Sequence, residues 1–154
     1  MSSRPPLRVV SAGEGEAAAR VRPPLRILVA DDDRDTSDSL AAILRDEGHE
    51  VSTVLRGDEV LGVERLMRPD ALIIDISMPG MSGYAVAREV RDRHGDAAPL
   101  LIAISGVWTR SSEQMLGRAV GFDHYLLKPC APGEIIALLD AFARHAGSRR
   151  RNAP

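Results

Sequence analysis

The chain has 154 residues, of which 44% are hydrophobic and 27% charged, a composition typical of one soluble globular domain rather than of a disordered or fibrous protein. Residues 26–143 carry 12 basic and 20 acidic side chains, so this body lacks the basic face that direct nucleic-acid binding requires. The single cysteine, Cys130, excludes an intramolecular disulfide and a cysteine cluster for a metal. No segment approaches the roughly 20 apolar residues of a membrane span, and no signal peptide is recognisable. We therefore expect a cytoplasmic protein without membrane contact.

Short apolar runs alternate with segments of helical period over residues 26–145, which predicts a single α/β domain with a parallel sheet and helices on both faces. Before it, residues 1–25 contain proline pairs and little apolar material, so we expect a disordered arm. After it, we expect a flexible basic tail over residues 146–154 and no further domain. The five strands are expected at Ile27–Ala30, Val51–Leu55, Ala71–Ile74, Leu100–Ile104 and Tyr125–Leu127. The five helices are expected around Leu40–Leu44, after a cap at Asp58, over Tyr84–Arg93, over Ser111–Val120 and around Ile135–Phe142, with Gly48 and Gly121 ending the first and the fourth.

Charged and hydroxyl side chains stand at the ends of four of the expected strands. Asp31 to Asp33 follow the first strand, Asp75 the third, Ser105 the fourth and Lys128 the fifth. Because ligand sites in such folds lie beyond the carboxyl ends of the strands, we expect these side chains to converge. Neighbouring carboxylates repel each other, and a divalent cation that prefers hard oxygen ligands, such as Mg2+, removes this cost.

Lys128 is the only lysine among 20 basic residues. A compact ammonium can pair with a phosphoryl oxygen where the broad guanidinium of arginine does not fit, so this position indicates a phosphoryl site. The alternative is a surface lysine that happens to be alone. For the three acids the alternative is capping of the next helix, the role that we expect for Asp33 or Asp35.

Four segments of the chain together resemble the receiver domains of response regulators in two-component signalling. They are Asp31-Asp32 after an apolar strand, the segment from Asp75 to Gly83, Ile104-Ser105-Gly106, and the segment from Tyr125 to Pro129. The resemblance covers about residues 26–145, in the correct order and spacing. It implies a doubly wound, flavodoxin-like parallel sheet of five strands in the order 2-1-3-4-5, with five helices.

The resemblance also implies the roles of the acids. Asp75 would be the phosphoacceptor for a histidine kinase or a phosphotransfer protein. Mg2+ would be bound directly by Asp32 and Asp75, through water by Asp31, and by the backbone carbonyl of Ser77. These roles agree with the demands of phosphoryl transfer, which are positioning and charge neutralisation.

Further roles concern the phosphoryl oxygens and the switch. Ser105 would donate a hydrogen bond to one phosphoryl oxygen, and Lys128, before a cis bond to Pro129, would pair with another. Ser105 and Tyr125 would form the switch, with the tyrosine ring turning from outward to inward upon phosphorylation. Ser77 and Val107 offer no acid or amide to orient an attacking water, which favours slow self-dephosphorylation.

The function expected from this resemblance is that of a single-domain response regulator, which catalyses only its own aspartyl phosphorylation and dephosphorylation, as in a phosphorelay. Its signal would leave through protein contacts on the face of the fourth helix, fifth strand and fifth helix. Trp108, in the loop after Ser105, would be a partner anchor or, alternatively, a lid on that loop. One alternative is a receiver-like adaptor that works without regulated phosphorylation. Another is an aspartate-nucleophile phosphatase of the haloacid-dehalogenase type, but the frames that begin at Asp31 and Asp32 lack its D-x-D-x-T/V pattern.

Overall fold

The computed structural model describes residues 23–106 and 120–151, which form a five-stranded parallel sheet in the order β2-β1-β3-β4-β5. This order confirms the predicted fold class, and every strand lies within one residue of its expected position. The strands are β1 (Arg26–Ala30), β2 (Glu50–Val54), β3 (Ala71–Asp75), β4 (Leu100–Ser105) and β5 (His124–Leu127). No helix in these two ranges is long and apolar enough to cross a membrane.

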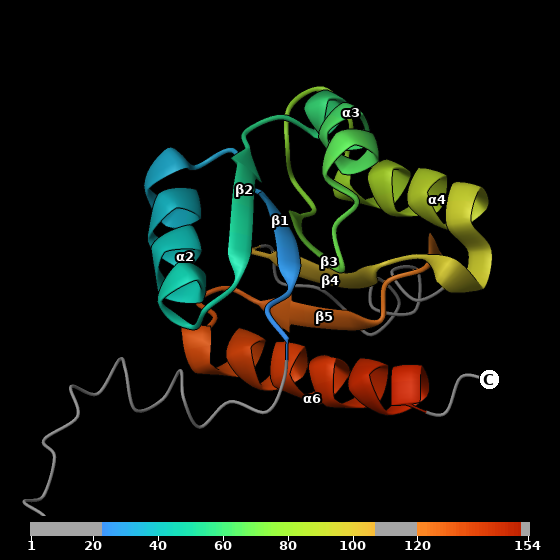
Figure 1. Cartoon of the computed structure of the whole chain (residues 1–154). Helices are drawn as coiled ribbons and strands as arrows, with labels where there is room; N and C mark the ends of the chain where they lie inside the picture. Colours follow the sequence, from blue (N-terminus) through green and yellow to red (C-terminus); the bar gives the residue numbers. More distant parts are fainter. Residues whose placement is uncertain (1–22, 107–119, 152–154) are drawn as a thin grey trace, which may run out of the picture.

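Helices cover both faces of this sheet (Figure 1), with α2 and α6 on one face and α3 and α4 on the other. They are α2 (Arg34–Asp46), α3 (Gly57–Met67), α4 (Gly83–His94) with the short 3-10 turn η1 (Gly95–Ala97), and α6 (Pro132–Arg151). The helix expected over Ser111–Val120 lies almost entirely outside the described residues, as do Trp108 and most of the expected N-terminal arm. Within the described part, Val120 is helical and Gly121 follows it with a φ of 115°, in agreement with the expected helix end.

Alternation along the strands divides the core into two layers. On the α3 and α4 side, three side chains of neighbouring strands are in register: Leu28, Leu72 and Leu101. On the α2 and α6 side, the corresponding three are Val29, Ile73 and Ile102. All six side chains are at most 1% exposed. Since the central strands are buried on both faces, their carboxyl ends are held rigidly and can position polar side chains.

Gly48 follows the end of α2 with a φ of 96°, in agreement with the expected end of this helix, and three further expected boundaries can be compared with the structure. Of the two acids expected to cap this helix, Asp33 and not Asp35 has the role, since the Asp33 carboxylate accepts hydrogen bonds from the backbone N–H groups of Asp35 and Thr36. The expected cap at Asp58 is wrong: α3 already begins at Gly57, because the Gly57 N–H donates to the Pro79 carbonyl of another loop and needs no side-chain partner. Helix α6 runs to Arg151, so the first part of the expected tail is helical.

Candidate functional site

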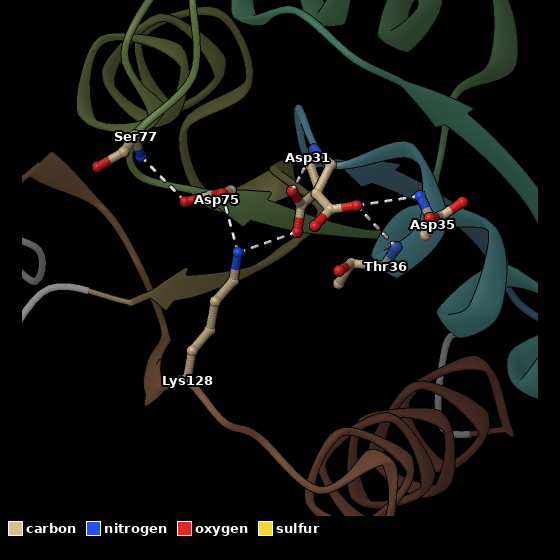
Figure 2. Close-up of polar contacts among 7 residues, drawn as sticks. Asp31, Asp35, Thr36, Asp75, Ser77 and Lys128 are labelled. Atoms are coloured by element: carbon tan, nitrogen blue, oxygen red, sulfur yellow. Dashed lines mark hydrogen bonds and ion pairs between the residues drawn. The ribbon is translucent and has the colours of Figure 1, made fainter.

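Three charged side chains meet at the carboxyl end of the sheet (Figure 2). Asp31 follows β1, Asp75 ends β3 and Lys128 follows β5. The Lys128 Nζ lies 3.0 Å from Asp75 Oδ2 and 3.2 Å from Asp31 Oδ2. Both carboxylates are buried, with side chains 6% and 8% exposed respectively. The predicted convergence of these strand ends is therefore confirmed, and one ammonium bridges two buried acids.

A third acid, Asp32, completes a group that could hold a metal ion. One carboxylate oxygen from each of Asp31, Asp32 and Asp75 lies within 4.8 Å of the other two. Asp32 is exposed, whereas the other two acids are buried, so the group opens to solvent on one side. Carboxylate oxygens are the ligands that Mg2+ prefers, and an open side leaves room for the waters that this ion retains. The residues present therefore fit a bound Mg2+.

The electrostatics of the cluster reflect its burial. Burial raises the pKa of Asp31 and outweighs the opposite effects of the hydrogen bond from the Asp33 N–H and of the nearby Lys128 ammonium. For Lys128, burial alone would lower the pKa, but the hydrogen bond to Asp75 and the charges of both acids raise it. Lys128 is therefore cationic at neutral pH. Adding a cation to the cluster opposes the repulsion that the carboxylates exert on one another.

The two oxygens of Asp75 have different partners. Its Oδ1 accepts a hydrogen bond of 3.0 Å from the backbone N–H of Ser77, and its Oδ2 accepts the one from Lys128. This pair of contacts fixes the orientation of the carboxylate (Figure 2). Ser77 therefore contacts Asp75 as a hydrogen-bond donor, through its backbone N–H group. The expected role of the Ser77 carbonyl as a metal ligand stays a prediction.

The loop after β3 is held against the start of α3. Besides the hydrogen bond from Gly57 to Pro79, a Cβ atom at Gly57 would overlap with the carbonyl oxygen of Met81. Only glycine permits this close approach of two backbones. The loop carries Ser77, so Gly57 helps to position the surroundings of Asp75. Sequence reasoning missed Gly57, because nothing near it in the chain indicates which loop lies against it.

The expected switch residues lie on neighbouring strands. Ser105 is buried at the end of β4, and its carbonyl accepts a hydrogen bond of 2.8 Å from the Lys128 N–H. Tyr125, on β5, packs against the core layer of α3 and α4, and its hydroxyl oxygen is buried without a hydrogen-bond partner in the described part of the chain. The ring is therefore already turned inward, which differs from the outward starting position that we expected. The switching role of both residues stays a prediction.

The bond between Lys128 and Pro129 is cis, as predicted. Val107 and Trp108 lie in the segment that the structure does not describe.

Comparisons with known proteins agree with this geometry. The family model "Response regulator receiver domain" matches residues 27–140. The chain is 35% identical over 119 residues to the DNA-binding response regulator MtrA of Mycolicibacterium paratuberculosis, a match that covers 77% of this chain and 51% of the relative. It is 38% identical over 121 residues to the response regulator MprA of Mycolicibacterium vanbaalenii, covering 79% and 51%. Its fold matches the chemotaxis response regulator CheY4 of Vibrio cholerae with a TM-score of 0.71 and 27% identity, covering 78% of this chain and 99% of that one.

The chain spans about half the length of the curated relatives that it matches. The comparisons therefore do not confirm the expectation of a single-domain protein. They also do not support the expected absence of nucleic-acid contact, since one relative is named as DNA-binding. The match over most of the chain, together with the acid cluster and the bridging lysine, is sufficient to assign the chain to a family. This chain belongs to the response regulator receiver domain family.

Proposed function

We propose that this domain accepts a phosphoryl group on Asp75 from the phosphohistidine of a histidine kinase or a phosphotransfer protein, with Mg2+ as cofactor. The observation that carries the proposal is the meeting of three carboxylates and one ammonium at the ends of the central strands. In the transfer, an oxygen of Asp75 forms a bond to phosphorus while the bond from phosphorus to the donor imidazole breaks, and the donor nitrogen keeps the electron pair.

The residues of this chain would contribute positioning and charge. The Ser77 N–H and the Lys128 ammonium orient the nucleophilic carboxylate before the transfer. Lys128 can then pair with an oxygen of the phosphoryl group, and the buried Ser105 hydroxyl can donate to another. Asp31, Asp32 and Asp75 would hold Mg2+, which supplies positive charge against the phosphoryl oxygens. Beyond this reaction and the loss of the group by hydrolysis, we propose no catalytic activity.

The signal is proposed to leave through protein contacts on β5, α6 and the segment between β4 and β5. The hydrogen bond from the Lys128 N–H to the Ser105 carbonyl joins the phosphoryl site to this face, and Leu127 on β5 is 46% exposed. We propose no direct contact of this domain with nucleic acid, because the acidic excess of residues 26–143 opposes binding to phosphates.

A small phosphodonor tests the proposal without a cognate kinase. Incubation with acetyl phosphate and Mg2+ is expected to add one phosphoryl group, which is measured by intact-protein mass spectrometry. Chelation of Mg2+ or the substitution Asp75→Ala should abolish the addition. Asp38→Ala, an exposed acid of α2 outside the cluster, serves as the matched control and should be phosphorylated like the native protein. A domain that binds Mg2+ but gains no phosphoryl group would favour the adaptor alternative.

A further inference from the structure

A cavity of about 690 Å³ lies between α2, the carboxyl half of the sheet and the start of α6. Its apolar wall is formed by Val29, Ile73 and Ile104 of the sheet, Leu40 and Ile43 of α2, and Ile135 of α6. Pockets of this size and character are typical of small-molecule sites.

The charge at one end of the cavity is negative. Asp31, Asp35 and Asp75 contribute three carboxylates to its lining, whereas Lys128 contributes one ammonium. Figure 2 shows that Lys128 approaches Asp31 and Asp75 from the β5 side, while Asp35 lies on α2 at the other side of the cluster. A ligand with a cationic group is therefore favoured at this end, and an anionic one is disfavoured.

Ser37 gives an independent indication of a ligand. This residue lines the cavity and is 0% exposed, and its hydroxyl oxygen has no hydrogen-bond partner among the described residues. Buried polar groups in native proteins nearly always have a partner. A ligand group that donates to the hydroxyl oxygen would satisfy it.

The lining also changes character along α2. Asp35 and Ser37 lie in the first turn and Leu40 and Ile43 further along the helix, so the polar partners are at one end of the cavity and the apolar ones at the other. We propose that the cavity binds a small organic cation, with its ammonium near Asp35 and Ser37 and its apolar body between Leu40, Ile43 and Ile135.

Such a ligand would act on the phosphoryl site. An ammonium near Asp35 and Ser37 would add positive charge at the end of the cavity that Asp31 and Asp75 also line, so ligand binding should oppose the binding of Mg2+ to these two acids. This consequence rests on the proposed function, whereas the binding itself does not.

Three linear probes of six carbon atoms with different head groups test the proposal: hexylamine, hexanol and hexanoate. In titrations followed by amide NMR on the whole chain, hexylamine should bind at least tenfold more tightly than hexanoate. The shifts should lie at Ser37, Ile43 and Ile135 and not on α3. Hexanol should lie between the two, because it keeps the apolar body and lacks the charge.

Two variants on the same helix locate the binding. Ser39 is exposed and lines the cavity, whereas Ala42 is exposed and does not. Ser39→Phe should fill the mouth and weaken hexylamine at least tenfold, and the matched control Ala42→Phe should leave its affinity unchanged. Cys130→Phe gives the same test from the opposite wall if Ser39→Phe does not fold.

Equal affinity for hexylamine and hexanoate, or equal effects of the filling variants and of Ala42→Phe, would overturn the proposal. Phosphorylation by acetyl phosphate, measured on the same samples without a probe, keeps the two proposals apart. If the domain is phosphorylated normally but does not bind hexylamine, only the cavity proposal is refuted. If it binds hexylamine at this place but is never phosphorylated, only the proposed function is refuted.

Discussion

Replacing Lys128 by methionine removes the ammonium that bridges Asp31 and Asp75 and keeps a side chain of similar length. Both carboxylates are buried, with side chains 8% and 6% exposed, while Lys128 is 30% exposed. Removing one partner of a fully buried ion pair costs about 3–5 kcal/mol. Because Lys128 is partly solvated, we expect a smaller loss in the free energy of unfolding, about 2–3 kcal/mol, when Mg2+ is absent.

The loss should depend on pH in a defined direction. Burial raises the pKa of Asp31 above its ordinary value of 3.8, so the folded state holds this proton more tightly than the unfolded state does. The contribution of Asp31 to stability is therefore fully present below its unfolded pKa and is lost as the pH rises through its folded pKa. Without the ammonium the pKa of Asp31 should rise further. The deficit of Lys128→Met should thus be largest at neutral pH and shrink towards pH 4.

Mg2+ should restore much of the loss, because it supplies the missing positive charge. A ligand that binds only the folded state at 100 times its Kd stabilises it by about 2.7 kcal/mol. Urea unfolding followed by circular dichroism, with and without Mg2+, measures both effects. Arg144→Met, at an exposed position of α6, is the control for the loss of one positive charge. The bridging role of Lys128 is refuted if Lys128→Met in chelator is as stable as this control, or if Mg2+ stabilises neither protein.

Three further predictions concern other contacts. Gly57→Ala should lower the free energy of unfolding by about 1–3 kcal/mol, because its Cβ would overlap with a backbone carbonyl. The control Gly62→Ala, whose Cβ meets no atom within 4 Å, should keep the native stability, and equal stability of the two variants in urea would contradict the close approach of the backbones at Gly57. His94→Ala removes the imidazole that lies 2.7 Å from the buried carboxylate of Glu64 and should lower the free energy of unfolding by about 1–3 kcal/mol. His94→Gln, which can keep the hydrogen bond, should lower it less, and equal losses in the two variants would exclude a stabilising contact between His94 and Glu64. Burial and the neighbouring carboxylate of Glu134 raise the pKa of the Cys130 thiol to about 11, so alkylation of Cys130 by iodoacetamide should be slow at pH 8 and accelerate up to about pH 11. An alkylation rate that levels off near pH 8.5 would disprove this environment of the thiol.

The strands and the centre of the site could be predicted because both depend on local pattern. Apolar runs such as Ala71–Ile74 indicate buried strands, and in a parallel sheet their carboxyl ends meet at one edge, so Asp31, Asp75 and Lys128 could be placed together from sequence alone. The cap of α2 at Asp33 was predictable for the same reason, since it depends on backbone groups only two and three residues away.

Features that depend on contacts between distant segments could not be predicted. An aspartate is a favoured cap, which made Asp58 the reasonable choice, but the loop at Pro79 supplies the partner for the first N–H of α3 instead. The inward position of Tyr125 likewise depends on the packing of the core layer. For α6, the basic run after residue 148 suggested a solvated tail, yet cations are favourable at the carboxyl end of a helix, and the helix continues to Arg151.

The central claim is that Asp75 carries the phosphoryl group in a reaction that needs Mg2+. The most direct test is to phosphorylate the domain with acetyl phosphate, reduce the acyl phosphate with borohydride, and locate the modified residue by peptide mass spectrometry. We predict modification at Asp75 alone, in samples with Mg2+ and not in samples with chelator. Modification at Asp31 or Asp32 instead, or the same yield at Asp75 without any divalent cation, would contradict the account.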